Sequence, residues 1–268
     1  MINNLTLGQY VSQNTFLHQI NPKVKLIFNS LYVFLLFFVN SFVSLGFCVI
    51  SILLIYFFCK FSINLIFKNL KIIAIFLVIA SFFNLFFVKT GKIIFEFLFL
   101  KITTDALILT MVLVLRIFLL ITGSSLLIYT TLPMDLTLAI EEILRPLKKF
   151  KLPIDEIAIM MSIALRFIPL LLEESSLIIS AQKSRGLDIY NQNGILKKVK
   201  ALSIFFIPLL VTSFKRASEL AISMEARCFR VGEIRTRYKS LKYSKLDFQF
   251  SITCVIFLIL VVVLNLLF

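Results

Sequence analysis

The chain has 268 residues, of which 60% are hydrophobic and only 16% are charged, and its mean hydropathy is +1.00. Its formal net charge is +14, from 28 basic and 14 acidic residues. Long apolar runs without ionisable residues are typical of membrane-spanning helices, because about twenty helical residues cross the hydrocarbon core. The runs are continuous and not alternating, which favours helices over barrel strands. This composition excludes a water-soluble domain and predicts an all-α integral membrane protein.

The reactive side chains exclude most catalytic and metal chemistry. One histidine and four cysteines, with no CxxC pair, form neither a metal-ligand spacing nor a disulfide framework. Thr90-Gly91-Lys92 is no phosphate-binding loop, because Phe86 and Ile93 stand where that motif needs glycine and serine or threonine. We therefore predict no catalytic residue, metal, cofactor or ATPase activity in this chain. The positive charge favours anionic lipid, not nucleic acid, as its partner.

Five apolar segments are predicted to cross the membrane. The uncharged run from Leu26 to Cys59 would measure about 51 Å as one helix, so we expect it to turn at Asn40-Ser41 and form two spans. A basic loop leads to the third span, and a mixed loop from Lys89 to Asp105 leads to the fourth. The third, fourth and last spans are predicted at 72–88, 106–130 and 248–268.

The lysines and arginines of the loops predict the orientation. Lys23 and Lys25 before the first span, with the lysines after the second, place those ends in the cytoplasm. Four crossings then return the chain to the cytoplasm near Pro133, and the fifth leaves the C-terminus outside.

Charge also marks a separate segment. Between Leu132 and Asp247 lie 19 of the 28 basic residues and 12 of the 14 acidic ones. Mixed charge at this density cannot lie in lipid. We therefore expect three parts, namely a bundle of about four transmembrane helices at 1–131, a cytoplasmic domain at 132–247 and a last transmembrane helix at 248–268.

Two long helical patterns in this segment share one plan. They run from Pro153 to about Arg185 and from about Ile195 to Arg230. Each has an apolar half too short to span a membrane, and a polar half that ends in arginine. Each also contains a proline, Pro169 or Pro208, which we expect to kink the helix because proline removes a backbone hydrogen bond.

The chain resembles the transmembrane T component of energy-coupling factor (ECF) transporters, the CbiQ-like family, most strongly from Leu132 to Tyr238. The opening "HQINPKVKL" is also similar to that family. The family's mark is a pair of motifs, usually Ala-Arg-Gly, at the ends of two coupling helices. Here they correspond to Ser184-Arg185-Gly186 and Ala226-Arg227-Cys228, each with one departure and each with its arginine.

The resemblance implies a non-catalytic subunit of a prokaryotic plasma membrane. Such a subunit links two ATP-binding cassette ATPases to a membrane-embedded S component, which captures a vitamin or metal ion.

Arginine at a helix end suits docking on a partner. Its planar guanidinium binds carboxylates bidentately, and the negative end of the helix dipole stabilises it. We expect Arg185 and Arg227, with Glu225 and Arg230 nearby, to meet the ATPases. The alternative is that arginine followed by glycine simply ends a helix. Two matched helices favour docking, and the resemblance assigns part of their apolar surface to the S component.

Two other functions stay open at this point. A secondary carrier or channel should have paired charges or broken helices in the membrane, and only Arg116 in the fourth span fits that pattern. For Arg116 we favour a role in helix packing over one in a transport path. A membrane-embedded enzyme would need a nucleophile, a metal or an acid–base set. The coupling subunit of an ATP-driven importer is therefore the favoured interpretation.

Overall fold

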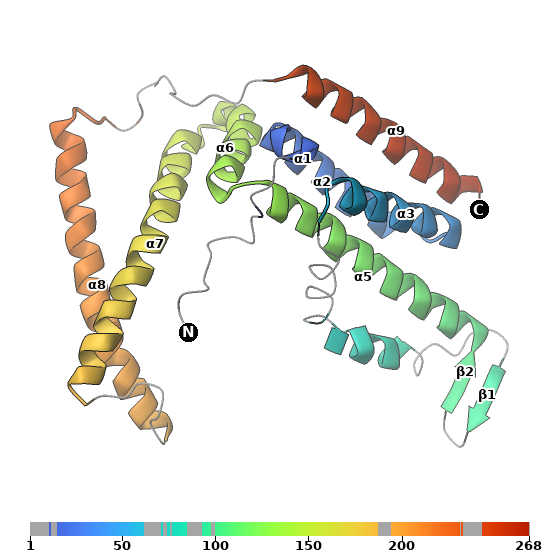
Figure 1. Ribbon diagram of the computed structural model, residues 1–268, viewed down its shortest axis with the longest axis horizontal. Helices are drawn as coiled ribbons and strands as arrows, with labels where there is room; N and C mark the ends of the chain where they lie inside the picture. Colours follow the sequence, from blue (N-terminus) through green and yellow to red (C-terminus); the bar gives the residue numbers. More distant parts are fainter. Residues whose placement is uncertain are drawn as a thin grey trace. The chain divides into compact units, whose positions relative to one another are not determined.

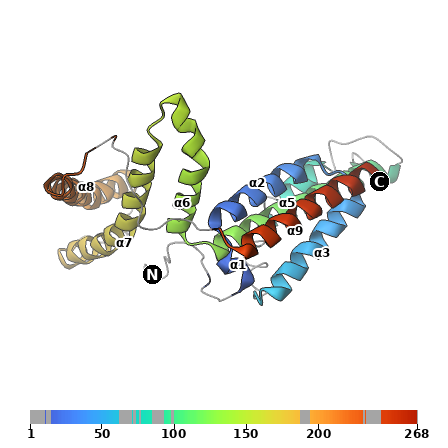
Figure 2. The ribbon, with the colours of Figure 1, turned by 90° about the horizontal axis from the view of Figure 1, so that it is seen from above.

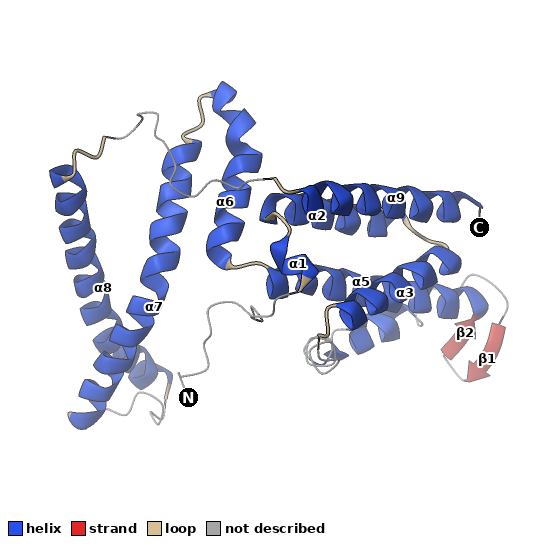
Figure 3. Cartoon of the chain, turned by 45° about the horizontal axis from the view of Figure 1, so that its top comes forward, coloured by secondary structure: helices blue, strands red, loops and turns tan. Residues whose placement is uncertain are grey.

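The computed structural model describes Val11 and residues 15–61, 71, 74–75, 77–84, 93–97, 100–186, 194–230, 232 and 243–267. These residues are predominantly helical, as predicted (Figures 1 and 3). They divide into two compact units. The bundle unit contains the described residues from Val11 to Leu132 and from Tyr243 to Leu267, and the long-helix unit contains those from Pro133 to Gly232.

The bundle unit consists mainly of four long helices that run alongside one another (Figures 1 and 2). They follow the short α1 (Phe16–Gln19) and are α2 (Pro22–Phe38), α3 (Phe42–Phe58), α5 (Thr104–Thr130) and α9 (Lys245–Leu267). Among the described helices, α5 and α9 are long and apolar enough to cross a membrane.

The helix bounds test the predicted spans. The predicted turn at Asn40-Ser41 is confirmed, because it separates α2 from α3. The predicted segments 106–130 and 248–268 correspond to α5 and α9, each of which begins two or three residues earlier. Of the predicted third span, 74–75 and 77–84 are helical, and the rest lies outside the described residues, as does Thr90-Gly91-Lys92.

A short β-hairpin lies within the loop of mixed charge, Lys89 to Asp105, that we predicted between the third and fourth spans. Strands β1 (Ile93–Phe97) and β2 (Leu100–Thr103) pair in antiparallel fashion, with an irregularity between Ile93 and Phe95. The segments IIFEF and LKIT are rich in β-branched and aromatic residues, which favour strands. The predicted all-α class holds for the described residues, with this hairpin as a short addition between two helices.

The turn between α2 and α3 is closed by polar side chains from two other helices. Arg116 in α5 donates from Nη2 to the Val39 carbonyl oxygen at 2.7 Å and to Asn40 Oδ1 at 2.8 Å. Asn265 Oδ1 in α9 accepts from the backbone N–H groups of Asn40 and Ser41, at 3.0 and 3.2 Å. These bonds pair backbone groups at a helix end, as an apolar medium requires. Arg116 therefore makes a packing contact of the kind that we favoured for it.

Polar side chains also pair backbone groups at the end of α5 and at the start of α2. Lys25, buried in α2, donates from Nζ to the Thr130 carbonyl oxygen at the end of α5, at 3.0 Å. Asp247, buried in the first turn of α9, accepts from the backbone N–H groups of Asn21 at 2.7 Å and Ser244 at 2.6 Å. Charged side chains thus join α2 to α5 and to α9.

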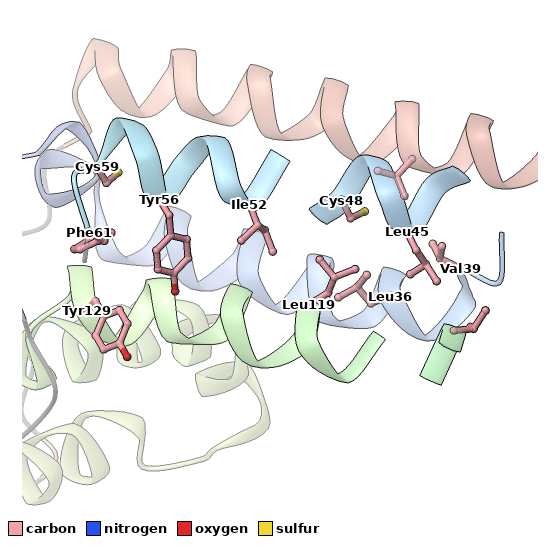
Figure 4. Packing of buried hydrophobic residues seen from close by; sticks show 12 residues of the cluster. Leu36, Val39, Leu45, Cys48, Ile52, Tyr56, Cys59, Phe61, Leu119 and Tyr129 are labelled. Atoms are coloured by element: carbon pink, nitrogen blue, oxygen red, sulfur yellow. The ribbon is translucent and has the colours of Figure 1, made fainter. Parts of the chain in front are cut away.

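Between these polar ends lies an apolar core contributed by α2, α3, α5 and α9 (Figure 4). The Tyr56 hydroxyl is hydrogen-bonded to Ser125 Oγ at 2.8 Å and donates to the Thr122 carbonyl oxygen at 3.2 Å. The core includes Leu36, Val39, Leu45, Cys48, Ile52, Tyr56, Leu119 and Tyr129.

The long-helix unit contains α6 (Pro133–Leu144), the 3-10 helix η2 (Arg145–Phe150), α7 (Ile154–Ser184) and α8 (Ile195–Ala226). Helix α7 packs against α6 on one side and against α8 on another, and α7 and α8 cross while running in opposite directions (Figures 1 and 3). Helix α8 ends at Ala226, four residues before the predicted end at Arg230.

Two details of this unit bear on the sequence analysis. Helix α6 was not predicted, although Pro133 is its first residue and Asp135 lies in its first turn, which are common features of a helix start. Helices α7 and α8 are continuous through Pro169 and Pro208. The kink at each proline stays a prediction.

The first testable prediction concerns the contact between α2 and α5 at Gly123. A Cβ atom at Gly123 would lie 2.4 Å from Tyr32 Cε1, whereas one at Gly46 in α3 would meet nothing within 4 Å. Gly123→Ala should therefore destabilise the protein by about 1–3 kcal/mol through overpacking. Gly46→Ala should be neutral or stabilise by up to about 1 kcal/mol, because alanine favours helix. Thermal unfolding in detergent measures both, and equal stabilities would contradict this packing.

A second prediction concerns Arg116. Arg116→Leu should lower the stability by about 1–3 kcal/mol despite its greater hydrophobicity, because the Val39 carbonyl loses its donor. Arg116→Lys should retain part of the stability, since one ammonium can still donate. Thermal unfolding in detergent measures the stability of both variants. A leucine variant as stable as the unmodified protein would contradict this role for Arg116.

Candidate functional site

The end of α7 is closed by its own backbone. Arg185 is the C-cap residue, and its N–H donates to the carbonyls of Ala181 and Gln182 at 3.3 and 3.1 Å. The Gly186 N–H donates to the Lys183 carbonyl at 3.0 Å, and Gly186 has a positive φ of 84°. A left-handed residue just after the C-cap is a common way to end a helix, and glycine is the residue that adopts it without strain.

The end of α8 has the same arrangement. Arg227 is its C-cap residue. The Cys228 N–H donates to the Glu225 carbonyl at 2.9 Å, and the Phe229 N–H donates to the Met224 carbonyl at 3.0 Å. These two bonds form a Schellman motif, in which the residue after the C-cap is left-handed. Cys228 occupies that position with a φ of 58°.

The two tripeptides singled out in the sequence are therefore equivalent in structure. In each, the second residue is the arginine C-cap and the third is left-handed, at Gly186 or Cys228. The first position tolerates serine, because the Ser184 hydroxyl donates to the Ser180 carbonyl of its own helix at 3.1 Å. Ala226 is exposed at the matching position of α8.

Both arginine side chains are available to a partner. Arg185 and Arg227 are exposed, and within the described part of the chain neither guanidinium has a hydrogen-bond or ion-pair partner. Backbone N–H groups, not the guanidinium groups, close the helix ends. Glu225 and Arg230 are exposed beside Arg227. Because α7 and α8 run in opposite directions, the two arginine caps lie at opposite ends of the crossed pair (Figure 1).

A large apolar surface lies on α8 between Val199 and Phe214. Exposed apolar patches of this kind mark contacts with a protein or with lipid. On α7, Met160 is exposed as well. The exposed apolar residues of α8 in this part are Val199, Leu202, Phe206, Ile207, Leu210, Val211 and Phe214.

Comparison with known proteins defines the chain as a membrane component of a transporter. Residues 13–238 match the CbiQ family, described as a cobalt transport protein. The chain is 41% identical over 268 residues to the energy-coupling factor transporter transmembrane protein EcfT of Clostridium kluyveri, covering 99% of this chain and 98% of that protein. Proteins of the same name from Ruminiclostridium cellulolyticum and Lactococcus lactis are 38% and 33% identical, over 100% and 97% of each chain. The chain therefore belongs to the CbiQ family of ECF transporter transmembrane components.

Sequence reasoning located the arginine caps but missed a polar contact between the helices that carry them. Glu174 of α7 and Arg216 of α8 form an ion pair. Neither residue belongs to a motif. An ion pair between two helices cannot be predicted from the sequence without knowing how the helices cross.

A third prediction compares the left-handed positions of the two caps. A non-glycine residue costs about 1–2 kcal/mol in the left-handed region. Cys228→Gly should therefore stabilise the last turn of α8 by about that amount. Gly186→Cys should cost a similar amount at the end of α7, where a Cβ would meet nothing within 4 Å and only backbone strain matters. Amide hydrogen exchange in the last turn of each helix measures both, and an unchanged rate in both variants would contradict this account.

Proposed function

We propose that this chain is the coupling component of an ECF importer. In that role it links ATP hydrolysis by two ATP-binding cassette subunits to uptake through a substrate-binding S component. The observation that carries the proposal is the matched pair of exposed arginine caps, Arg185 and Arg227, at the ends of two crossed helices. The names of the relatives support the assignment to an ECF transporter.

The physical argument starts from the exposed guanidinium groups of Arg185 and Arg227. Each is a fixed positive charge with two parallel donor pairs, and an acidic groove on a cytoplasmic protein would complement it. Two such charges at opposite ends of one crossed pair fit two copies of a similar groove, one on each ATPase. A change in the distance between the ATPases on binding nucleotide would then act on α7 and α8 directly.

The apolar surface of α8 fits the second partner. Leu202, Phe206 and Leu210 lie on an exposed face, whereas the polar end of the helix carries Arg227. In this proposal the apolar face contacts the S component, which selects the vitamin or metal ion. ATP hydrolysis belongs to the ATPases, and we assign no catalytic group to this chain.

The proposed topology follows from these partners. The long-helix unit must lie in the cytoplasm to reach the ATPases, with 1–131 and 248–268 in a prokaryotic plasma membrane and the C-terminus outside. A secondary carrier with its own substrate path is less well supported, because the Nη2 group of Arg116 already donates to the end of α2.

A fourth prediction tests docking. Loss of one partner from a buried, hydrogen-bonded charge pair costs about 2–5 kcal/mol. Arg185→Glu and Arg227→Glu should each weaken ATPase association strongly, and the double variant should abolish it. Arg227→Lys should have a smaller effect, because lysine lacks the bidentate fork. Co-purification of the ATPases with tagged protein in mild detergent is the measurement.

The neighbouring Arg230→Glu is the matched control, since it changes the charge by the same amount a few residues beyond the cap and should matter less. Equal membrane insertion and normal co-purification of the S component show that each variant is folded. Wild-type levels of both ATPases with the Arg185→Glu, Arg227→Glu double variant would overturn the proposed function.

A further inference from the structure

An ion pair joins the two helices that carry the arginine caps. Arg216 of α8 donates from Nη2 to Glu174 Oε1 of α7, and the exposed fractions of the two side chains are only 35% and 17%. The second carboxylate oxygen, Glu174 Oε2, is buried with no hydrogen-bond partner among the described residues. A partly buried pair of this kind fixes geometry more strongly than a solvated one, because separating it strands a charge away from water.

The ion pair is equally far in sequence from the two arginine caps. Glu174 precedes Arg185 by 11 residues, and Arg216 precedes Arg227 by the same 11 residues. At 1.5 Å per residue, each cap lies about 16 Å along its own helix from the ion pair. If α7 rotated against α8 about the ion pair, both caps would therefore move through similar arcs.

The polar residues around the pair do not duplicate it. The hydroxyl of Ser175 donates to the Leu172 carbonyl of its own helix at 2.7 Å. In α8, Ser213 donates to the Leu209 carbonyl at 2.6 Å. These hydroxyl groups bond within a helix and supply no link across the crossing.

We infer that Glu174 and Arg216 are positioning residues that set the angle between α7 and α8, and thereby the separation of the arginine caps presented to the two ATPases. The inference deepens the proposed function and rests on it for its consequence, but the ion pair's effect on helix geometry does not require any partner. Its failure can therefore be distinguished from failure of the docking proposal.

The direct test measures the separation of the caps in the full chain reconstituted in nanodiscs. Spin labels at the exposed Cys228 and at Lys183→Cys report on the two helix ends. Of the other cysteines, Cys48 and Cys59 are buried, and Cys254→Ser removes the partly buried thiol so that it is not labelled. Glu174→Gln and Arg216→Gln should each broaden or shift the distance distribution measured by pulsed electron spin resonance. The charge swap of Glu174→Arg with Arg216→Glu should restore it.

A matched control comes from the same unit. Lys148 of η2 and Asp155 of α7 also form an ion pair, but both side chains are more exposed and the pair does not join α7 to α8. Exchanging these two charges should leave the distance distribution unchanged. A distribution that is also unchanged in Glu174→Gln and Arg216→Gln would overturn the inference.

The functional consequence is measured in the assembled transporter. Both single glutamine variants should keep the ATPases bound, because Arg185 and Arg227 are intact, yet should hydrolyse about threefold more ATP per substrate molecule imported. The swap should return this ratio toward the wild-type value. An unchanged ratio in variants with altered cap separation would show that the ion pair positions the helices without affecting coupling, and would overturn the inference in its functional part.

Discussion

The requirement that backbone polar groups be paired in apolar surroundings governs this structure. Apolar side chains alone cannot close a helix end, because four carbonyl or four N–H groups stay unpaired there. The bundle unit meets this requirement with a few polar side chains. Arg116 and Asn265 close the turn between α2 and α3, whereas Lys25 pairs with the end of α5 and Asp247 with the start of α2. Each reaches a different helix from its own, so the groups that complete the hydrogen bonding also hold the bundle together.

The long-helix unit meets the same requirement differently, and the difference matters for function. At the ends of α7 and α8 the backbone turns left-handed and supplies its own donors, through Gly186 and Cys228. No side chain is needed to end either helix. The guanidinium groups of Arg185 and Arg227 therefore stay outside the capping network, exposed and without a hydrogen-bond or ion-pair partner among the described residues. This arrangement supports our proposal that a partner binds at the arginines.

The sequence predicts those features that depend on local composition. The local features are the uninterrupted apolar runs, the polar turn at Asn40-Ser41 and the residues at the ends of α7 and α8. The structure confirms the turn and both long helices.

Features that depend on contacts between distant segments could not be predicted. Arg116 could be recognised as an unusual charge in an apolar helix, but its acceptor lies 77 residues away. The Glu174–Arg216 pair joins residues 42 positions apart, and nothing in either local sequence marks them as partners. The hairpin of β1 and β2 was missed because IIFEF begins with three apolar residues and lacks the strict alternation that indicates a half-buried strand.

Helix α8 keeps its different surfaces on one continuous element. Most of its exposed apolar residues lie between Val199 and Phe214, Arg216 follows two residues later, and Arg227 is the C-cap residue. A continuous helix transmits displacement along its axis, so movement at the arginine end reaches the apolar face. Pro208 is the position at which the helix could bend. Arg216, which pairs with Glu174, lies along α8 between this apolar face and the arginine cap, and we infer that the pair couples movement of the cap to the angle between α7 and α8. The order of these features along α8 thus gives a physical route by which a force applied to the cap could change the surface offered to a second membrane protein.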